Sequence, residues 1–117
     1  MKLWHADYSW EFPEGGTTLL STSLAEAKRA AIENCANQMQ EDRENAEKYG
    51  TTVGDGNTLT VTIGPAVVRK LDAKAVCEII NNNGCFWMAA GTREEPVLRI
   101  TMTHKMKKPK VERIKQP

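Results

Sequence analysis

The sequence predicts a single α+β domain built as a two-layer sandwich. Residues 4–12, 58–63 and 97–104 alternate between apolar and polar side chains, the pattern of strands half buried on one face of a sheet. Two stretches between them, 24–48 and 73–82, have apolar residues at helical spacing instead. We therefore expect a mixed or antiparallel sheet of about four to five strands, with both helices packed on one of its faces.

The first strand carries its aromatic residues on one side. The expected inward residues are Trp4, Ala6, Tyr8, Trp10 and Phe12, while His5, Asp7, Ser9 and Glu11 are expected to face outward. The segment 13–16 combines proline, glutamate and two glycines, a composition typical of a turn. Residues 17–21 are a weaker candidate for a short return strand.

The longer helix is predicted from its cap and its apolar stripe. Ser23 precedes the helix and Glu26 follows three residues later, which is the pattern of a capping box. The inward stripe is expected to consist of Leu24, Ala27, Ala31, Cys35 and Met39. From Gln40 onward most residues are charged or polar, so we expect the helix to project beyond the core before Gly50 ends it.

The segment 66–71 fits two structures, because its valines favour an extended chain while its apolar spacing also fits a helix. We prefer the extended form, since Asp72 is a good N-cap for the following helix, and Leu71 with Val76 would form a hydrophobic staple around it. The basic order of elements is β-α-β-α-β-β, and an extended 66–71 makes a ferredoxin-like βαββαβ order possible.

The end of the domain is expected to close as a hairpin. Residues 85–90 are apolar on both faces, as in an interior strand, and 91–96 has the polar composition of a turn. Residues 97–104 then form the neighbouring strand. We assign residues 1–104 to this one domain.

The body and the C-terminal tail carry charges of opposite sign. Six of the 16 basic residues lie in 105–117 beside one acidic residue, whereas the rest of the chain holds ten basic and fourteen acidic residues. Two prolines and few apolar residues argue against a packed element in this tail. A basic tail can neutralise nucleic-acid phosphates or dock on an acidic protein surface. Its candidate contact residues are Lys105, Lys107, Lys108, Lys110, Arg113 and Lys115.

No residue pattern in the sequence points to catalysis or to a bound group. Cys35, Cys77 and Cys85 form no CxxC pair, which indicates free thiols in a reducing compartment. The two histidines, His5 and His104, lie near the ends of the first and last predicted strands, where a solvated or half-buried ring is the common state. Metal-ligand spacing and a phosphate-binding glycine loop are missing as well. We expect a non-enzymatic protein without metal or cofactor.

The outward face of the sheet is the candidate binding surface. The predicted strands place on it His5, Asp7, Ser9, Thr58, Thr60, Thr62, Arg99, Thr101 and Thr103. One side of strand 85–90 shares this face, so an aromatic residue is expected among polar neighbours, as on a binding platform. Trp87 and Arg99 are the expected anchors beside Thr101, and Phe86 replaces Trp87 if the strand has the opposite register.

These features predict a non-catalytic interaction protein that binds and modulates another macromolecule, with a protein as the favoured partner. In its small size and lack of motifs the chain is similar to inhibitors made by phages and mobile elements, such as anti-CRISPR proteins. The alternative is a nucleic-acid-binding module that uses the tail and the open sheet, and a Cys/His-dependent enzyme comes third. No apolar run approaches the roughly 20 residues of a membrane span, and residues 1–7 lack the apolar stretch of a signal peptide. A cytoplasmic protein is therefore expected, with neither a membrane contact nor a small-molecule substrate.

Overall fold

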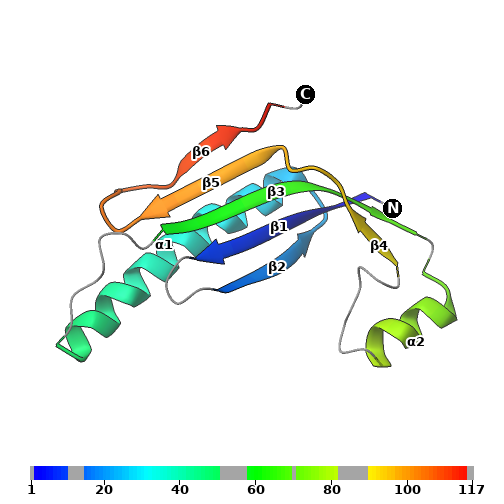
Figure 1. Cartoon of the computed structure of the whole chain (residues 1–117), viewed down its shortest axis with the longest axis horizontal. Coiled ribbons are helices and arrows are strands. Elements are labelled where there is room, and N and C mark those ends of the chain that lie inside the picture. Colours follow the sequence, from blue (N-terminus) through cyan, green and yellow to red (C-terminus); the bar gives the residue numbers. More distant parts are fainter. Residues whose placement is uncertain (1, 11–14, 51–57, 70, 82–89, 116–117) are drawn as a thin grey trace.

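The computed structural model describes residues 2–10, 15–50, 58–69, 71–81 and 90–115, which form six strands and two helices. In chain order these are β1 (Lys2–Trp10), β2 (Gly15–Ser21), α1 (Leu24–Lys48), β3 (Thr58–Val68), α2 (Ala73–Asn81), β4 (Gly91–Arg93), β5 (Leu98–Thr103) and β6 (Lys110–Arg113). All pairings in the single open sheet are antiparallel, in the order β2-β1-β3-β5-β6, with β4 beside the far end of β3 (Figure 1). The predicted α+β class is confirmed, with six strands in place of four to five.

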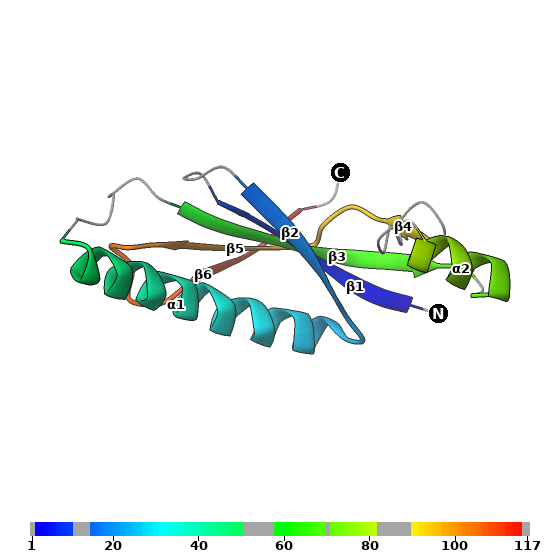
Figure 2. The ribbon, with the colours of Figure 1, turned by 90° about the horizontal axis from the view of Figure 1, so that it is seen from below.

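Helix α1 covers one face of the sheet, and the core lies between them (Figure 2). The buried core residues are Ala6, Tyr8, Ala27, Ala31, Cys35, Met39, Leu59, Val61, Ile63, Leu98, Ile100 and Met102. The structure describes four of the inward residues predicted for the first strand, and all four pack in this core. Most of the apolar residues predicted for the buried side of the first helix pack here as well. The face of the sheet opposite α1 is called the open face below.

Helix α2 does not share the face that α1 covers, so the prediction of two helices on one face is wrong. It lies beyond the end of the sheet, where Ala75 is its one buried residue in the part described (Figures 1 and 2). The cause is the length of β3, which continues through Gly64 and Pro65 to Val68 and carries the chain beyond the part of the sheet that α1 covers (Figure 2). The carbonyl oxygen of Pro65 accepts a 2.9 Å hydrogen bond from the N–H of Glu94. The nitrogen of Pro65, which carries no hydrogen, therefore faces the irregular segment between β4 and β5 and not β1. A proline is tolerated in a strand at such a place.

The extended form of residues 66–68 is confirmed, and the weak return strand is confirmed as β2. The ferredoxin-like order is not observed, because the elements follow the order β-β-α-β-α-β-β-β. Residues 91–93 form β4, so the expected turn over 91–96 is wrong in its first half. Residues 85–89 lie outside the described residues. The described neighbours of β5 are β3 on one side and β6 on the other.

The C-terminal segment adds strand β6 to the sheet. Arg99 lies opposite Glu112, and Thr101 lies opposite Lys110. The amide of Ile114 extends this pairing with a 2.9 Å bond to the carbonyl oxygen of Val97. The expectation that 105–117 holds no packed element is therefore wrong for 110–113. Pro109 does not prevent this pairing, because a proline before the first residue of an edge strand costs no hydrogen bond of the sheet.

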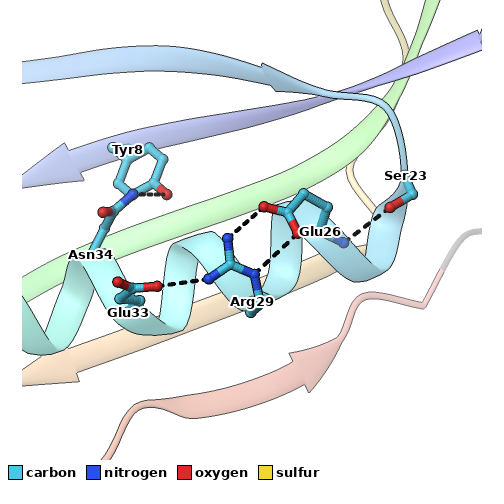
Figure 3. Close-up of polar contacts among 6 residues, drawn as sticks. All are labelled: Tyr8, Ser23, Glu26, Arg29, Glu33 and Asn34. Atoms are coloured by element: carbon cyan, nitrogen blue, oxygen red, sulfur yellow. Dashed lines mark hydrogen bonds and ion pairs between the residues drawn. The ribbon is translucent and has the colours of Figure 1, made fainter.

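Helix α1 begins as predicted at Ser23, whose Oγ accepts the N–H of Glu26 at 3.1 Å. The Glu26 carboxylate pairs with Arg29, which also donates to Glu33 at 2.7 Å (Figure 3). Asp72 caps α2 through a 2.8 Å bond from the N–H of Ala75. Neither of these helices has the combined length and apolarity that crossing a bilayer requires, in the part of the chain that the structure describes.

Candidate functional site

Strand β2 forms one outer edge of the sheet. It pairs with β1 on one side, and no described segment pairs with its other side. Its seven residues, Gly-Gly-Thr-Thr-Leu-Leu-Ser, include no charge and no proline. Leu19 is 46% exposed and Leu20 is 41% exposed, one on each face of the strand. Such an edge offers unpaired backbone N–H and C=O groups to an additional strand.

The opposite edge of the sheet, formed by β6, is protected. This strand has four residues, three of them charged, and it follows Pro109. Charged side chains, proline and short length are the features by which natural sheets discourage edge pairing. Of the two ends of the described sheet, only the β2 edge is therefore suited to receive a strand.

A groove of about 330 Å³ lies between β2 and α1, and we call it the β2 groove. Its floor is apolar and consists of Tyr8, Trp10, Leu19 and Leu59, while its rim is polar and consists of Thr17, Asn34, Asn37, Gln38 and Glu41. The floor suits an apolar side chain, and the amides on the rim can donate to or accept from a peptide backbone. The groove therefore runs beside the edge at which an added strand would lie.

Two contacts fix the floor of the β2 groove. Trp10 lies opposite Gly15, and a Cβ atom on Gly15 would stand only 2.8 Å from the indole Nε1 atom, so glycine leaves the space that this ring fills. The Tyr8 hydroxyl accepts a 3.0 Å hydrogen bond from Nδ2 of Asn34, which joins β1 to α1 (Figure 3). Burial raises the pKa of Tyr8 above its usual value of 10.0, while the bond from Asn34 lowers it in part. The phenol therefore stays neutral and able to bond near neutral pH.

The sequence prediction missed the β2 groove, although a signal was present. Four polar residues of α1 recur at the helical spacing i, i+3, i+4 and i+7, so they form one stripe beside its buried positions. They are Asn34, Asn37, Gln38 and Glu41. A stripe of amides on a helix is chemically distinct from the charged residues that usually cover a solvated face. Without the position of β2, however, nothing in the sequence said what this stripe faces.

The residues predicted to bind a partner lie elsewhere. Arg99 and Thr101 belong to β5 in the interior of the sheet, and strand register places them on the open face. Trp87 and Phe86 lie outside the described residues. The predicted polar composition of the open face is confirmed by the register, which aligns Asp7, Thr62 and Arg99 in one row. Every aromatic side chain that β1 supplies packs toward α1 instead.

The basic residues of the C-terminal segment do not form one patch. Lys105, Lys107 and Lys108 lie between β5 and β6, Lys110 and Arg113 belong to β6, and Lys115 follows it. Lys110 lies on the open face with its Nζ atom 3.8 Å from a Glu112 oxygen, whereas Arg113 lines a groove on the α1 side. The structure therefore distributes these charges over two faces of the sheet.

The prediction of a solvated or half-buried His5 on the outward face is wrong in its burial, because this residue is only 2% exposed. Its Nδ1 atom lies 2.9 Å from Oδ2 of Asp7, and its Nε2 atom lies 2.9 Å from the carbonyl oxygen of Glu94. The cause of the burial is the segment 94–96, which rises over this face above Gly64 (Figure 2). Both ring nitrogens are engaged within the fold, so the arrangement supports a structural role for His5.

Cys35, Cys77 and His5 lie in separate parts of the fold. Cys35 is buried on the α1 side of the sheet, His5 lies on the open face, and Cys77 is exposed on α2. No cluster of three metal-ligating side chains occurs among the described residues. Comparison with protein-family models, with characterised proteins and with solved structures finds no match.

Proposed function

We propose that this protein is a non-catalytic interaction protein that binds an extended segment of a partner protein by strand addition to β2. The observation that supports this most is the coincidence of an uncharged open edge with the β2 groove beside it. Strand addition next to a helix-lined groove is a recurring mode of peptide recognition. The backbone bonds supply affinity, and the groove supplies specificity.

The geometry defines what the bound segment should look like. In an added strand alternate side chains point to opposite faces, so one set enters the β2 groove near Trp10 and Leu19, and the other set lies beside Leu20. Burying one apolar side chain contributes about 1.5–3 kcal/mol, and each net backbone bond about 1 kcal/mol, before the cost of association is subtracted. Among the described residues Glu41 is the one charged residue that lines the groove, so a basic residue at that end of the segment is favoured.

Binding of this kind can modulate a partner without any chemistry. A segment held along β2 is withdrawn from its other contacts, so the partner loses whatever interaction that segment makes. We propose that this protein acts as a competitive inhibitor of its partner in this sense.

The alternative function, nucleic-acid binding, has weaker support. Its favouring feature is the cluster of lysines between β5 and β6, which is exposed. On the open face, however, Arg99 stands between Thr62 of β3 and Glu112 of β6. Asp7 of β1 lies on the other side of Thr62. These acidic neighbours oppose the approach of a phosphate backbone. If nucleic acid is the partner, binding must fall steeply with salt, by a slope near −0.9 in log K against log salt for each phosphate neutralised.

The test is a selection of binding peptides from a random displayed library on the wild-type protein, followed by affinity measurements on variants. Leu19→Asp places a charge on the floor of the β2 groove and should weaken a selected peptide by about 100-fold or more. Val111→Asp is the matched control, because Val111 is similarly exposed at 38% but stands on β6.

The proposal also predicts how the selected peptides bind. N-methylation at alternate peptide residues should abolish binding, since it removes the N–H groups that bond to β2. Peptides that bind the Leu19→Asp protein as tightly as the wild type, or that tolerate N-methylation at every position, contradict strand addition.

A further inference from the structure

A second groove lies on the other flank of α1, between the first turns of the helix, the start of β5 and the end of β6. Its volume is about 410 Å³, within the range of roughly 300–1,000 Å³ that small-molecule sites occupy. Its apolar walls are Leu24, Ala25, Val97, Leu98 and Ile114. We call it the basic groove, because the other two lining residues in the part of the chain that the structure describes are Lys28 and Arg113.

The two cations of the basic groove are not neutralised within the described residues. Lys28 and Arg113 are both exposed, and neither makes an ion pair or hydrogen bond with any residue that the structure describes. The neighbouring acids are already engaged: Glu26 pairs with Arg29, and Glu112 lies on the open face near Lys110. The N-terminal end of α1, which forms one side of the groove, adds a positive partial charge.

The lining also limits the kinds of ligand that fit. Among the described residues, its lining includes no hydroxyl, amide or carboxylate side chain, the groups that sugars, nucleosides and cations need. What it offers is an apolar surface about the size of a short aliphatic chain, with two cations at its border. Arginine in particular binds carboxylates with two parallel hydrogen bonds.

We infer that the basic groove binds an aliphatic carboxylate of the fatty-acid class. The tail lies against Leu24, Leu98 and Ile114, and the carboxylate lies between Lys28 and Arg113. This site is separate from the β2 groove, which lies on the opposite flank of α1 and has the acidic Glu41 in its lining. The inference therefore does not depend on the proposed strand addition.

The test is a titration of the isotope-labelled full chain with decanoate, followed by amide chemical shifts, with decanol and acetate as companion ligands. Decanoate should give saturable shifts centred on the residues of the basic groove. Decanol lacks the charge and acetate lacks the tail, so each should bind at least about tenfold more weakly.

Two variants locate the site independently. Arg113→Gln should weaken decanoate binding by about tenfold or more, because one charge-assisted contact is lost. Ala25→Trp fills the groove from the exposed surface of α1 and should abolish binding, while the amide spectrum reports that the fold is retained. Lys74→Gln removes a cation of α2, no residue of which is among the described lining of the groove, and should leave binding unchanged.

The inference is overturned if decanoate produces no saturable shifts, if decanol binds as tightly as decanoate, or if the shifts centre on β2. It is also overturned if Arg113→Gln binds decanoate like the wild type, which keeps the test decisive should Ala25→Trp fail to fold.

Discussion

The Nε2 atom of His5 lies 2.9 Å from the carbonyl oxygen of Glu94, and this contact ties β1 to the segment that joins β4 to β5. The Nδ1 atom faces Oδ2 of Asp7 at the same distance, and the other oxygen of Asp7 accepts a 2.7 Å bond from the hydroxyl of Thr18. The ring and Asp7 together thus connect β1 to β2 and to the segment after β4. A ring with this many partners should be costly to replace.

The second histidine provides a matched comparison. The His104 side chain is 6% exposed, and neither of its nitrogens makes a hydrogen bond within the described residues. The Oδ2 atom of Asp42 lies 3.5 Å from the Nε2 atom of this ring. His5→Leu should lower the free energy of unfolding by about 3 kcal/mol, because it leaves polar partners without bonds. His104→Leu should raise it by about 1 kcal/mol, because it removes a buried polar ring that lacks bonds.

Urea unfolding of the two variants under identical conditions measures both effects. Equal destabilisation by the two substitutions would contradict the roles assigned to these rings. A fully tolerated His5→Leu would show in particular that the contact with Glu94 does not hold the crossing segment in place.

The two described cysteines should differ in reactivity. Burial raises the pKa of the Cys35 thiol to about 11, while Cys77 is exposed on α2. Only the thiolate is alkylated, so near pH 8 Cys35 should react at least about 100-fold more slowly than Cys77 in the folded protein. Peptide mapping after timed exposure to iodoacetamide measures each site. Rapid labelling of Cys35 without unfolding would show that the core between α1 and the sheet is open.

The same thiol gives a direction for alkaline stability. The unfolded chain loses the Cys35 proton near its usual pKa of 9.0, whereas the folded protein keeps this proton until about pH 11. Stability should therefore fall as the pH rises above about 9, and Cys35→Ala should show a smaller fall than the wild type. Parallel thermal unfolding curves over this pH range provide the measurement. An identical pH dependence in both proteins would contradict the raised pKa.

The C-terminal segment should contribute to stability. Deleting residues 105–117 removes β6, which pairs with β5, and Met106, which packs against the core. We expect a loss of about 2–4 kcal/mol, consistent with removal of one large core-lining side chain and several ladder bonds. Replacing Lys107 and Lys108 with glutamine is the control, because these exposed lysines lie between the strands. A truncated protein as stable as the wild type would show that β6 is dispensable.

Strands and helices whose apolar residues recur at a regular spacing were predictable from the sequence, whereas the elements that pack beside them were not. The alternation of β1 and the stripe of α1 each report one buried face, so both were assigned correctly. Strand β2 has no alternation because it lies at an edge with an exposed leucine on each face, and its weak signal reflects that position. Periodicity also says nothing about which strands pair, so the sequence predicts an unpacked tail where the structure has β6.

The burial of His5 was unpredictable for a related reason. The strand pattern placed this ring correctly on the face opposite Ala6, but a segment about ninety residues away covers it. The β2 groove likewise needs a strand and a helix whose relative position no local pattern encodes. Contacts between distant segments thus determine where the candidate site lies.

The measurement that tests strand addition most directly is amide hydrogen exchange of residues 15–21, with and without a peptide selected for binding. In the free protein, alternate amides of β2 point away from β1 and should exchange rapidly. Strand addition predicts that the bound peptide slows exchange at those alternate positions and leaves β6 unchanged. Protection that falls on the open face or on β6, with no change along β2, would contradict the account.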